Sequence, residues 1–500
     1  MSTLTRDLTR TRSVRAEARA GEVVVGCAAV AWAALFSWLA VARHDAFWTG
    51  RFDLGNMTQA VWSTLHGRPL ESTDVAGDQI SRLAAHVDPL LLALAPVYAV
   101  WPDPRALLVG QAVIVAAGAF PAYWLGRRWI GESRLALAIP AAYLLYPPLQ
   151  WSVVTDVHAV TLVAPLLVLA IWAAEEKRDV VLALAVALAL LGKEQVGLTV
   201  AALGLWVWLA RGRRRAGILL AVAGAGWTVV AVGAIQPRAA GGAESPFAGR
   251  YDSLGGGPGG ILTAAVTRPW EVGALMLEHG AIEYLAALLL PLALLPLGAP
   301  ALAAVALPEI GVNLVSDWPA QHTVQFHYTA VIAPVLVAAA ALGLARAVDG
   351  ALPGPLRALA RRPRAVALVL VGAVTIGGVV SGPLPWWQHV PFGSDDRVEQ
   401  FTRTDHVDAM AAAVAIVPNG VPVSAGNLLA AHLSERRRIY TFPTVRDAEY
   451  VVVDTRRPFV HDVESPRRHA SALRAFLRRG DYTRVFSRDG VLVFRRTADG

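Results

Sequence analysis

Long apolar runs recur along most of the 500-residue chain, from Val23 to Val380, and they constrain the fold more than any other feature. One crossing of a bilayer needs about 20 apolar residues, so a chain with many such runs is a polytopic membrane protein. The composition agrees, because 55% of the residues are hydrophobic and only 17% are charged, against about 25% charged in a soluble domain. The high apolar fraction also excludes a disordered chain.

The first apolar run begins near Glu22 and ends near Ala42, after a basic N-terminal segment at residues 1–21. The apolar core of a signal peptide has about 7–15 residues, so this longer run predicts a retained first span with the basic segment in the cytoplasm. The single cysteine, Cys27, excludes an internal disulfide and a cysteine-based metal cluster. We interpret the net charge of +7 as membrane orientation, and we expect no nucleic-acid partner.

Clusters of arginine between the apolar runs determine the predicted topology, because short cytoplasmic loops are rich in Lys and Arg. Such clusters occur at Arg127–Arg134, Arg211–Arg215 and Arg346–Arg364. Eleven spans place all of them in the cytoplasm, at residues 22–42, 106–126, 135–149, 160–174, 180–191, 196–210, 217–235, 284–297, 299–315, 329–344 and 365–380. The predicted fold is therefore mostly α, a polytopic transmembrane helical bundle of about 11 spans.

One further apolar segment, Asp88–Trp101, would invert this topology if it were counted as a span. It has only 14 residues, with prolines inside it. A helix of that length rises about 21 Å, short of a hydrocarbon core of about 30 Å, so we expect a re-entrant or juxtamembrane helix on the outer side. The transmembrane domain then covers residues 22–382, with a first exterior loop at 43–105 and a large exterior loop at 236–283.

The last part of the chain, residues 383–500, has a different pattern. Expected helices at 398–416, 428–434 and 466–479 alternate with expected strands at 421–425, 438–442 and 450–454. Residues 485–494 predict a hairpin with its turn at Asp489–Gly490. This alternation predicts a small exterior α/β domain. We expect that domain to cap a cavity and to bind the acceptor.

Polar side chains gather at the exterior ends of the predicted spans. In the first loop, Asp53, Asn56 and Gln59 alternate with apolar residues in helical register. The pattern suits a helix on the membrane surface with its polar face toward a cavity. An ordinary interfacial helix with Asp53 as its N-cap explains the pattern as well.

Two acid–histidine pairs lie in other exterior segments. His86 and Asp88 open the short apolar helix, where Asp88 could equally serve as an N-cap. Asp156 and His158 lie in the tight turn between the third and fourth spans, where a polar turn without a function is the alternative. Both pairs are candidates for a site on the outer face.

Lys193 and Glu194 form the sharpest single feature, because Lys193 is one of only two lysines and follows a 12-residue apolar run. A charge at mid-bilayer costs about 2.5–3.5 kcal/mol on insertion scales, so a charge near this depth usually faces a cavity or a partner. The alternative is a lysine that snorkels to water. Further residues that could line an exterior site are Arg250, Tyr251, His327 and Tyr328, although an aromatic belt also explains Tyr328.

Several common motifs are absent from the sequence. It contains no Walker loop, no dinucleotide-binding glycine motif and no His-Glu-x-x-His motif. Their absence argues against an ATP-driven pump and against the common zinc proteases.

With those residues collected, the chain resembles a bacterial and archaeal family of predicted membrane proteins of unknown function that is placed among the GT-C glycosyltransferases. The resemblance rests on stretches that occur in order from about residue 44 to 455. They are Phe52–Asn56 with Gln59 and Trp62, His86–Pro89, Asp156–His158, Lys193–Glu194, Arg250–Tyr251 with Leu254–Gly255, Pro308–Glu309 with His327–Tyr328, and Ala431–Ser434.

The resemblance implies sugar transfer from a polyprenyl-phosphate donor, with acidic residues of two exterior loops in catalysis. Asp53 and Asp156 match those places and are the expected catalytic residues. The expected substrate-binding residues are Asn56, Gln59, His86, Asp88, His158, Lys193, Glu194, Arg250, Tyr251, His327 and Tyr328. No adjacent acidic pair stands at Asp53, so we expect that the protein requires no cofactor. A bound divalent cation is an alternative that no acidic pair supports.

The expected protein is thus an integral glycosyltransferase of the cell membrane that acts on the outer face, with its N-terminus in the cytoplasm and its C-terminal domain outside. Its expected partners are a polyprenyl-phosphate lipid donor, a glycan, lipid or protein acceptor, and membrane lipids. Two other classes stay open at this point. A secondary transporter or lipid flippase usually has repeated halves, which this sequence does not show, and a non-catalytic membrane scaffold would bind a partner through the exterior domain.

Overall fold

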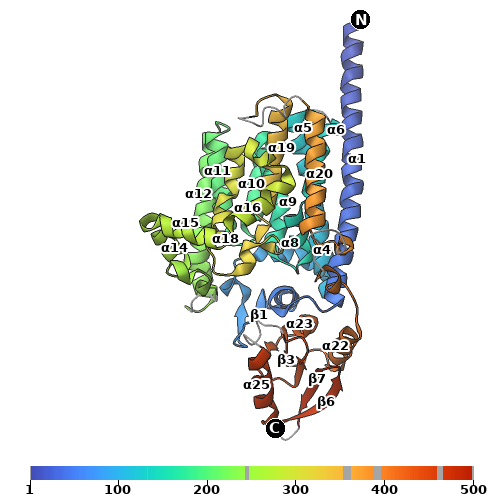
Figure 1. Cartoon of the computed structure of the whole chain (residues 1–500), viewed down its shortest axis with the longest axis vertical. Coiled ribbons are helices and arrows are strands. Elements are labelled where there is room, and N and C mark those ends of the chain that lie inside the picture. Colours follow the sequence, from blue (N-terminus) through green and yellow to red (C-terminus); the bar gives the residue numbers. More distant parts are fainter. Residues whose placement is uncertain are drawn as a thin grey trace.

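The computed structural model describes residues 2–131, 133–242, 247–352, 362–387, 396–458 and 466–497. A helical bundle stands on a small mixed domain, and helix α1 (Ser2–Asp45) runs along one side of the bundle and projects beyond it (Figure 1). The side chains of residues 2–16, within the predicted basic segment, lie outside the described part, as do residues 353–361 of the predicted basic loop.

Each predicted span falls on a helix or on a run of short helices. After α1, the bundle contains α4 (Pro104–Ala116), α5 (Ala119–Ile130), α6 (Ser133–Ala136), α7 (Ala138–Leu145), α8 (Pro147–Val154), α9 (Val163–Glu175), α10 (Asp179–Leu190), α11 (Val196–Leu209), α12 (Arg214–Val230), α16 (Ala281–Leu289), α17 (Pro300–Ala303), α18 (Leu307–Leu314), α19 (Ile332–Val348) and α20 (Pro363–Ser381).

The lengths of these helices decide how many cross a membrane by themselves. Four of the described helices are long and apolar enough, and a fifth crossing is present if Pro269–Glu278 and Ala281–Leu292, which are bent by 67°, form one span. The other apolar helices have 10–17 residues. The number of eleven spans therefore stays a prediction.

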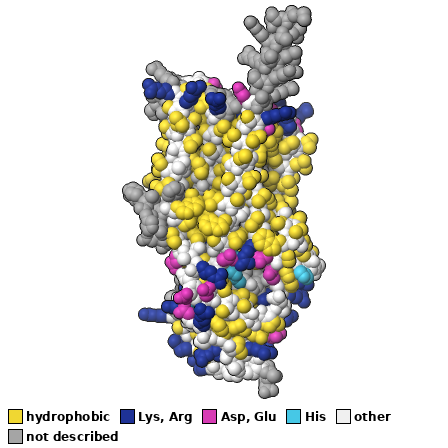
Figure 2. Space-filling view, turned by 90° about the vertical axis from the view of Figure 1, so that its right-hand side faces the viewer, with side chains coloured by type: hydrophobic (Ala, Val, Ile, Leu, Met, Phe, Trp, Pro, Cys, Tyr) yellow, Lys and Arg dark blue, Asp and Glu magenta, His cyan; other side chains and the backbone are white. Residues whose placement is uncertain are grey.

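A wide hydrophobic band covers the bundle on the face shown in Figure 2. Lys and Arg side chains gather at the end from which α1 projects, whereas acids, bases and histidines mix at the end that meets the small domain. Large apolar side chains stay exposed around the bundle, including Val30, Val113, Leu219 and Leu368. Apolar surface of this extent marks contact with lipid, so this is a membrane protein with one basic end.

Helices α11 and α12 pack closely because small residues face each other. A Cβ added at Gly197 would lie 2.3 Å from the backbone oxygen of Gly224, and one added at Gly224 would lie 2.4 Å from the oxygen of Gly197. Membrane helices use glycine in this way, because lipid tails are as apolar as the helices and close van der Waals packing must hold them together. Thr228 of α12 also donates a hydrogen bond to the Glu194 carbonyl at 2.9 Å, which anchors the loop before α11.

The first exterior loop forms a short π-helical turn, a helix and a small sheet. The turn η1 (Arg51–Gly55) continues into α2 (Asn56–Leu65), and strand β1 (Glu71–Thr73) pairs antiparallel with β2 (Gln79–Ser81). The sequence does not predict this sheet, because each strand has only three residues. The predicted re-entrant segment forms two short helices, η3 (Pro89–Leu94) and α3 (Ala95–Val100).

The large exterior loop is mostly helical and exposed. Its elements are α13 (Gln236–Ala239), η6 (Ala248–Leu254), α14 (Gly257–Thr267) and α15 (Pro269–Glu278). Residues 243–246 of the loop lie outside the described part. Among the described residues of the two longer helices, Ala264 of α14 is buried, and α15 buries no residue.

The C-terminal domain is a five-stranded sheet between helices, which confirms the predicted small α/β domain. Its strands are β3 (Val423–Ala425), β4 (Ile439–Thr441), β5 (Tyr450–Asp454), β6 (Tyr482–Arg488) and β7 (Val491–Arg496), in the order β4-β3-β5-β7-β6. The first three run parallel, and β6 and β7 form the predicted hairpin. Helices α22 (Asp405–Ile416) and α23 (Asn427–Ala430) pack on one face and α25 (Pro466–Leu477) on the other.

One predicted helix of this domain is wrong in its extent. We expected a single helix at 398–416, whereas the structure has a turn, α21 (Asp396–Glu399), and then α22. The break occurs because the Thr404 side chain accepts a hydrogen bond from the Val407 amide and caps a new helix. Residues 388–395, 459–465 and 498–500 of the predicted domain lie outside the described part.

Candidate functional site

Side chains from distant segments of the chain meet where the bundle joins the C-terminal domain. A series of direct contacts joins Asp53 to His158, His158 to His327, His327 to Tyr328 and Tyr328 to Arg250. They come from η1, the turn after α8, the segment η11 (His327–Thr329) and η6. We call these five residues, together with Lys193, the polar cluster.

The acidic side of the polar cluster is Asp53. Its Oδ1 accepts a hydrogen bond from His158 Nε2 at 3.1 Å, and its side chain is 47% exposed while that of His158 is 8% exposed. Burial would raise the pKa of Asp53, but the hydrogen bond and charge of His158, with Arg250 and Arg82, outweigh it and hold the pKa below its usual value. Asp53 is therefore an ionised, accessible carboxylate that a buried histidine orients.

A second carboxylate, Asp156, lies two residues before His158. Its φ of +60° is in the left-handed region that non-glycine residues rarely adopt. Arg43 Nη1 lies 3.7 Å from Asp156 Oδ2, and both side chains are nearly buried. Burial raises the pKa of Asp156 to about 7; the charge of Arg43 opposes this rise and the charge of Asp53 adds to it. Asp156 can therefore exchange a proton near neutral pH.

A stack of aromatic rings separates the acidic side from the basic side. The rings of His158 and His327 stack with centroids 3.4 Å apart, and His327 contacts Tyr328 at 4.3 Å. Burial lowers the pKa of His327 well below its usual value, and the neighbouring His158 and Lys193 add to this effect. The His327 ring is therefore neutral at pH 7.

The basic side consists of two cations that converge on Tyr328. Arg250 Nη1 lies 3.4 Å from the Tyr328 hydroxyl, and Lys193 Nζ lies 5.8 Å from the centre of the Tyr328 ring. Lys193 is only 7% exposed, and no described carboxylate forms an ion pair with it. Burial lowers its pKa, and the nearby Glu194 and Glu309 partly oppose this change. A buried cation without a paired anion suits a phosphate ligand.

Two other predicted site residues, His86 and Glu194, bond to each other next to the polar cluster. Glu194 accepts hydrogen bonds from His86 Nδ1 and from the Val87 amide, each at 3.0 Å. Burial lowers the pKa of His86. The pKa of Glu194 falls to about 2 because His86 and Lys193 outweigh the effect of burial. We therefore assign a neutral His86 that donates its Nδ1–H to an ionised Glu194.

Asp88 and Tyr251 also bond to protein groups. Asp88 is held by the guanidinium of Arg82 at 2.6 to 3.0 Å, and both side chains are buried. Tyr251, on the same turn as Arg250, contacts Gln321 through its hydroxyl, and burial raises its pKa. These residues position the loops around the polar cluster.

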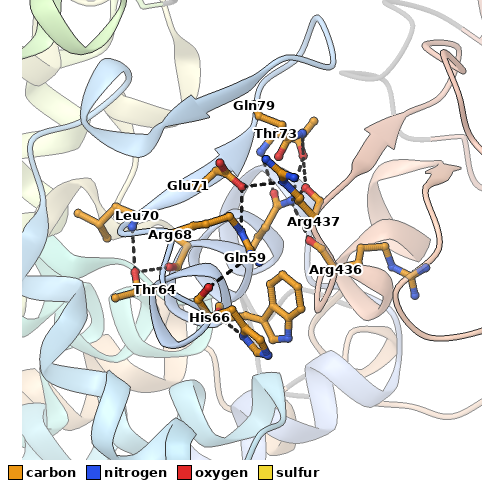
Figure 3. A network of polar contacts seen from close by, with 12 residues as sticks. Gln59, Thr64, His66, Arg68, Leu70, Glu71, Thr73, Gln79, Arg436 and Arg437 are labelled. Atoms are coloured by element: carbon orange, nitrogen blue, oxygen red, sulfur yellow. Dashed lines mark hydrogen bonds and ion pairs between the residues drawn. The ribbon is translucent and has the colours of Figure 1, made fainter.

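Asn56 and Gln59 do not join the polar cluster. Asn56 donates to the Phe52 carbonyl at 3.1 Å, and its Oδ1 is buried without a partner among the described residues. Gln59 is fully buried, and its Nε2 donates to Thr73 Oγ1 and to the carbonyls of Arg436 and Arg437 at 2.9 to 3.0 Å (Figure 3). The polar face of α2 thus meets the C-terminal domain at Gln59, whereas we expected it to face a cavity.

The C-terminal domain also holds the turn that carries Asp53. Asn427 Oδ1 accepts a hydrogen bond from the Phe52 amide at 3.2 Å, and buried Arg51 donates to Thr441 Oγ1 at 2.7 Å. Phe47 packs into the apolar core beneath one face of the sheet. We call these contacts, together with those of Gln59, the loop–domain joint.

Sequence reasoning gave no site role to three charged residues next to the polar cluster, Arg43, Arg82 and Glu309, although Glu309 belongs to a stretch that carries the family resemblance. Glu309 is 1% exposed, and Gln195 donates a hydrogen bond to its Oε1. The sequence does contain a signal for Glu309, because an acidic residue inside a predicted span usually has a functional partner. Arg43 and Arg82 gave no such signal, since each lies in an exterior loop where a free arginine is ordinary.

The acids of the site already contact basic side chains, His158 for Asp53 and Arg43 for Asp156. In the described ranges, no group of three or more His, Cys, Asp or Glu side chains could hold a metal ion. What the site offers is an accessible carboxylate, a stack of aromatic rings and two cations.

The bundle, the folded first exterior loop and the polar cluster beside the C-terminal domain define a helical membrane protein with a small C-terminal α/β domain. The chain belongs to the family described as predicted membrane protein (DUF2079), whose model matches residues 43–493. Both the family and the GT-C-type fold that we expected from the sequence are thereby confirmed. No curated protein matches the chain in sequence.

Solved structures give the fold relationship. ArnT from Cupriavidus metallidurans bound to undecaprenyl phosphate matches with a TM-score of 0.54 and 14% identity, over 95% of this chain and 98% of that chain. ArnT in the apo state matches with a TM-score of 0.49 and 15% identity, over 94% and 99%. The Archaeoglobus fulgidus oligosaccharyltransferase in the apo form matches with a TM-score of 0.43 and 11% identity, over 94% and 74%.

Proposed function

We propose that this protein is a glycosyltransferase that moves a sugar from a polyprenyl-phosphate donor to a cell-envelope acceptor on the outer face of the membrane. The observation that carries the proposal is the polar cluster, in which the accessible carboxylate of Asp53 is linked through stacked rings to the cations Lys193 and Arg250. The fold supports it, because ArnT is bound to undecaprenyl phosphate in the structure that matches this chain.

The two cations bind the donor phosphate. Lys193 lies three residues after the end of α10. In this proposal the lipid phosphate lies at that level while its polyprenyl chain stays in the bilayer. The phosphate gains negative charge as it leaves, so a fixed cation stabilises the transition state more than the bound donor. Tyr328 contacts both cations and keeps them close to each other.

Asp53 acts as the general base. The acceptor hydroxyl attacks the anomeric carbon, a new glycosidic C–O bond forms, and the bond between that carbon and the phosphate oxygen breaks. The hydroxyl proton moves to Asp53, and the polyprenyl phosphate leaves with the electron pair of the broken bond. His158 donates to Asp53 and so orients the carboxylate. A base placed in this way contributes about 10²–10⁴-fold to the rate.

Asp156 and the orientation in the membrane complete the proposal. Asp156, next to Arg43, orients the acceptor beside the base.

The basic end of the bundle faces the cytoplasm, in line with the positive-inside rule, so the N-terminus lies inside and the polar cluster with the C-terminal domain lies outside. The eleven predicted spans fit this orientation.

Purified full-length protein in lipid nanodiscs tests this function directly. We expect it to convert a labelled polyprenyl-phosphate sugar, given a glycan acceptor, into a glycosylated product and free polyprenyl phosphate. A flippase would move the labelled lipid between leaflets of a vesicle without breaking the sugar–phosphate bond, and a scaffold would do neither. Movement without bond cleavage across a panel of donor sugars would contradict the proposal.

A further inference from the structure

A groove of about 510 Å³ opens at the opposite membrane end of the bundle from the polar cluster. Helix α9 shows the separation, because it begins five residues after His158 and ends at Glu175, beside the groove residue Glu176. A helix of 13 residues rises about 20 Å, which is most of the hydrocarbon thickness. The groove is thus a separate site in the other leaflet.

Two tryptophans give the groove an amphipathic lining. Trp124 of α5 and Trp172 of α9 lie with ring centroids 5.0 Å apart, and both line the groove. Tryptophan is enriched at the level of lipid headgroups, where one side of the ring meets hydrocarbon and the indole N–H meets polar groups. The lining therefore suits a ligand that is part apolar and part polar.

The charges in the groove do not balance. Arg128 pairs with Glu176 at 3.1 Å, and Trp124 Nε1 donates to Glu22 Oε1 at 3.3 Å, so both acids of the groove are engaged. Arg178 lies over the Trp172 ring at 5.0 Å and forms no ion pair with a described carboxylate. Arg127 likewise has no described ion pair, and its Nε is buried without a hydrogen-bond partner. Arg127 and Arg178 therefore have no ion-pair partner among the described residues, and the groove lining carries one more basic than acidic side chain.

The other described arginines at this end lie outside the groove, and some of them are paired. Arg211 is paired with Glu175, and Arg213 is paired with Asp179. Arg214 is exposed outside the groove. Arg127 and Arg178, by contrast, are unpaired and line the groove together with the two stacked tryptophans. The groove is large enough for a small ligand.

We propose that this groove binds the headgroup of an anionic glycerophospholipid from the leaflet opposite the polar cluster. The planar guanidinium fork matches phosphate oxygens, and basic pockets between membrane helices hold anionic headgroups. Exposed Val23 and Val24, next to Glu22 on α1, offer an apolar surface for the acyl chains. A zwitterionic lipid carries no net charge and leaves the excess positive charge of the groove uncompensated, so phosphatidylglycerol is the simplest matching lipid.

Native mass spectrometry of the delipidated full-length protein tests this site. Titration with palmitoyl-oleoyl phosphatidylglycerol (POPG) and with the phosphatidylcholine of the same acyl chains (POPC) gives the two affinities. We expect the wild type to prefer POPG by about tenfold or more, and we expect R127Q/R178Q to lose that preference, because each lost charge-assisted bond is worth about a factor of ten. The matched control R214Q/R215Q removes the same charge at the same end and should keep the preference.

Three results would overturn the proposal. One is unchanged POPG affinity in R127Q/R178Q, and the second is an equal loss in the R214Q/R215Q control, which would mean general surface charge. The third is full displacement of POPG by inorganic phosphate at equal concentration, which would mean a site for free anions. If the double variant does not fold, Arg178→Gln replaces it, since Arg178 is exposed, and an unchanged affinity there counts equally against the site.

Discussion

The two long exterior loops bring opposite groups to the polar cluster, and they are held in opposite ways. The first loop carries Asp53 on a turn whose residues Arg51, Leu54 and Gly55 are buried, and the loop–domain joint fastens that turn to the C-terminal domain. The second loop carries Arg250 and leads into helices that bury almost none of their described residues. A bond from the Asp317 amide to the Arg250 carbonyl at 2.7 Å ties it to the bundle.

This difference fits the two tasks of the proposed reaction. A general base must stay within hydrogen-bond reach of the acceptor, so a rigid mounting favours the rate. A lipid donor must enter from the bilayer, so a phosphate-binding residue on a weakly packed loop can move aside and return. The comparison therefore predicts that changes at the first loop affect turnover, whereas changes at the second loop affect donor capture.

The largest effect is expected at Asp53. Asp53→Asn keeps the shape and most hydrogen bonding of the side chain but removes the base, so transfer should fall by about 10²–10⁴-fold. Donor binding, measured with a labelled polyprenyl phosphate, should stay within a few fold of the wild type. Near-normal turnover would contradict the assignment, and Asp156→Asn would then be the next variant to measure.

The next largest effect distinguishes the role of Lys193 from that of Arg250. Lys193→Met should lower kcat by about 10²–10³-fold, because a buried, fixed charge at the leaving phosphate acts in the transition state. Arg250→Met should mainly raise the KM for the donor, because its loop is loosely packed. Steady-state kinetics on equal amounts of folded protein measure both. If Lys193→Met only lowers expression, with normal activity per folded molecule, Lys193 has a structural role.

A smaller effect is expected at the loop–domain joint. Gln59→Leu leaves the Arg436 and Arg437 carbonyls without their buried donor, which should lower stability by about 1–3 kcal/mol. If the joint positions Asp53, kcat should fall while the KM for the donor stays unchanged. Thr64→Ala removes hydrogen bonds of the same helix that stay within the first loop, to the Ala60 carbonyl and from the Leu70 amide, and is the matched control for unfolding temperature. An equal rise in KM would show that the joint holds both loops.

The smallest effect is a pH dependence at His432, which stacks between His44 and Phe47 with centroids 4.0 and 3.8 Å away. Burial, with a smaller effect from the charge of Arg105, lowers the pKa of His432 to about 3. The unfolded chain then binds a proton that the folded chain does not, so this contribution is present above pH 6.5 and is lost as the pH falls below it. At pH 5 the loss is about 2 kcal/mol.

His432→Phe keeps the stacked ring and removes the titration. Its unfolding temperature should fall less between pH 7.5 and pH 5 than that of the wild type. Asp156 titrates with the opposite sign in both proteins and cancels in the comparison. Burial and the charge of His432 also lower the pKa of the stacked His44, so the difference between the two curves reports His432 together with its effect on His44. Parallel curves would contradict the assignment.

The sequence predicts the bundle well and the joint poorly, for physical reasons. Apolar runs are local, so each helix of the bundle can be found from its own residues. Asp53, His158 and Lys193 are candidates from the sequence because polar residues gather at the exterior ends of the predicted spans, and the structure places them in one polar cluster. The role of Gln59 could not, because its partners are 377 and 378 residues away and helical register does not show what a polar face contacts.

The contacts within the polar cluster differ in the same way between local and long-range ones. Asp156 and His158 are close in sequence and their proximity to each other could be expected, but the contact between His158 and His327 depends on how the helices pack. The small sheet of the first loop escaped prediction because three-residue strands carry almost no periodic signal. Ligand contacts that depend on loop packing are, for the same reason, beyond a reading of the sequence.

The joint between Gln59 and Arg436 also sets an order of events during synthesis. A ribosome that adds about 5–20 residues per second needs about 20–75 s to make the 377 residues between the two partners. Throughout that interval the first loop has been synthesised but lacks the carbonyls that Gln59 binds. The loop–domain joint can therefore form only after Arg436 and Arg437 have been made, late in synthesis.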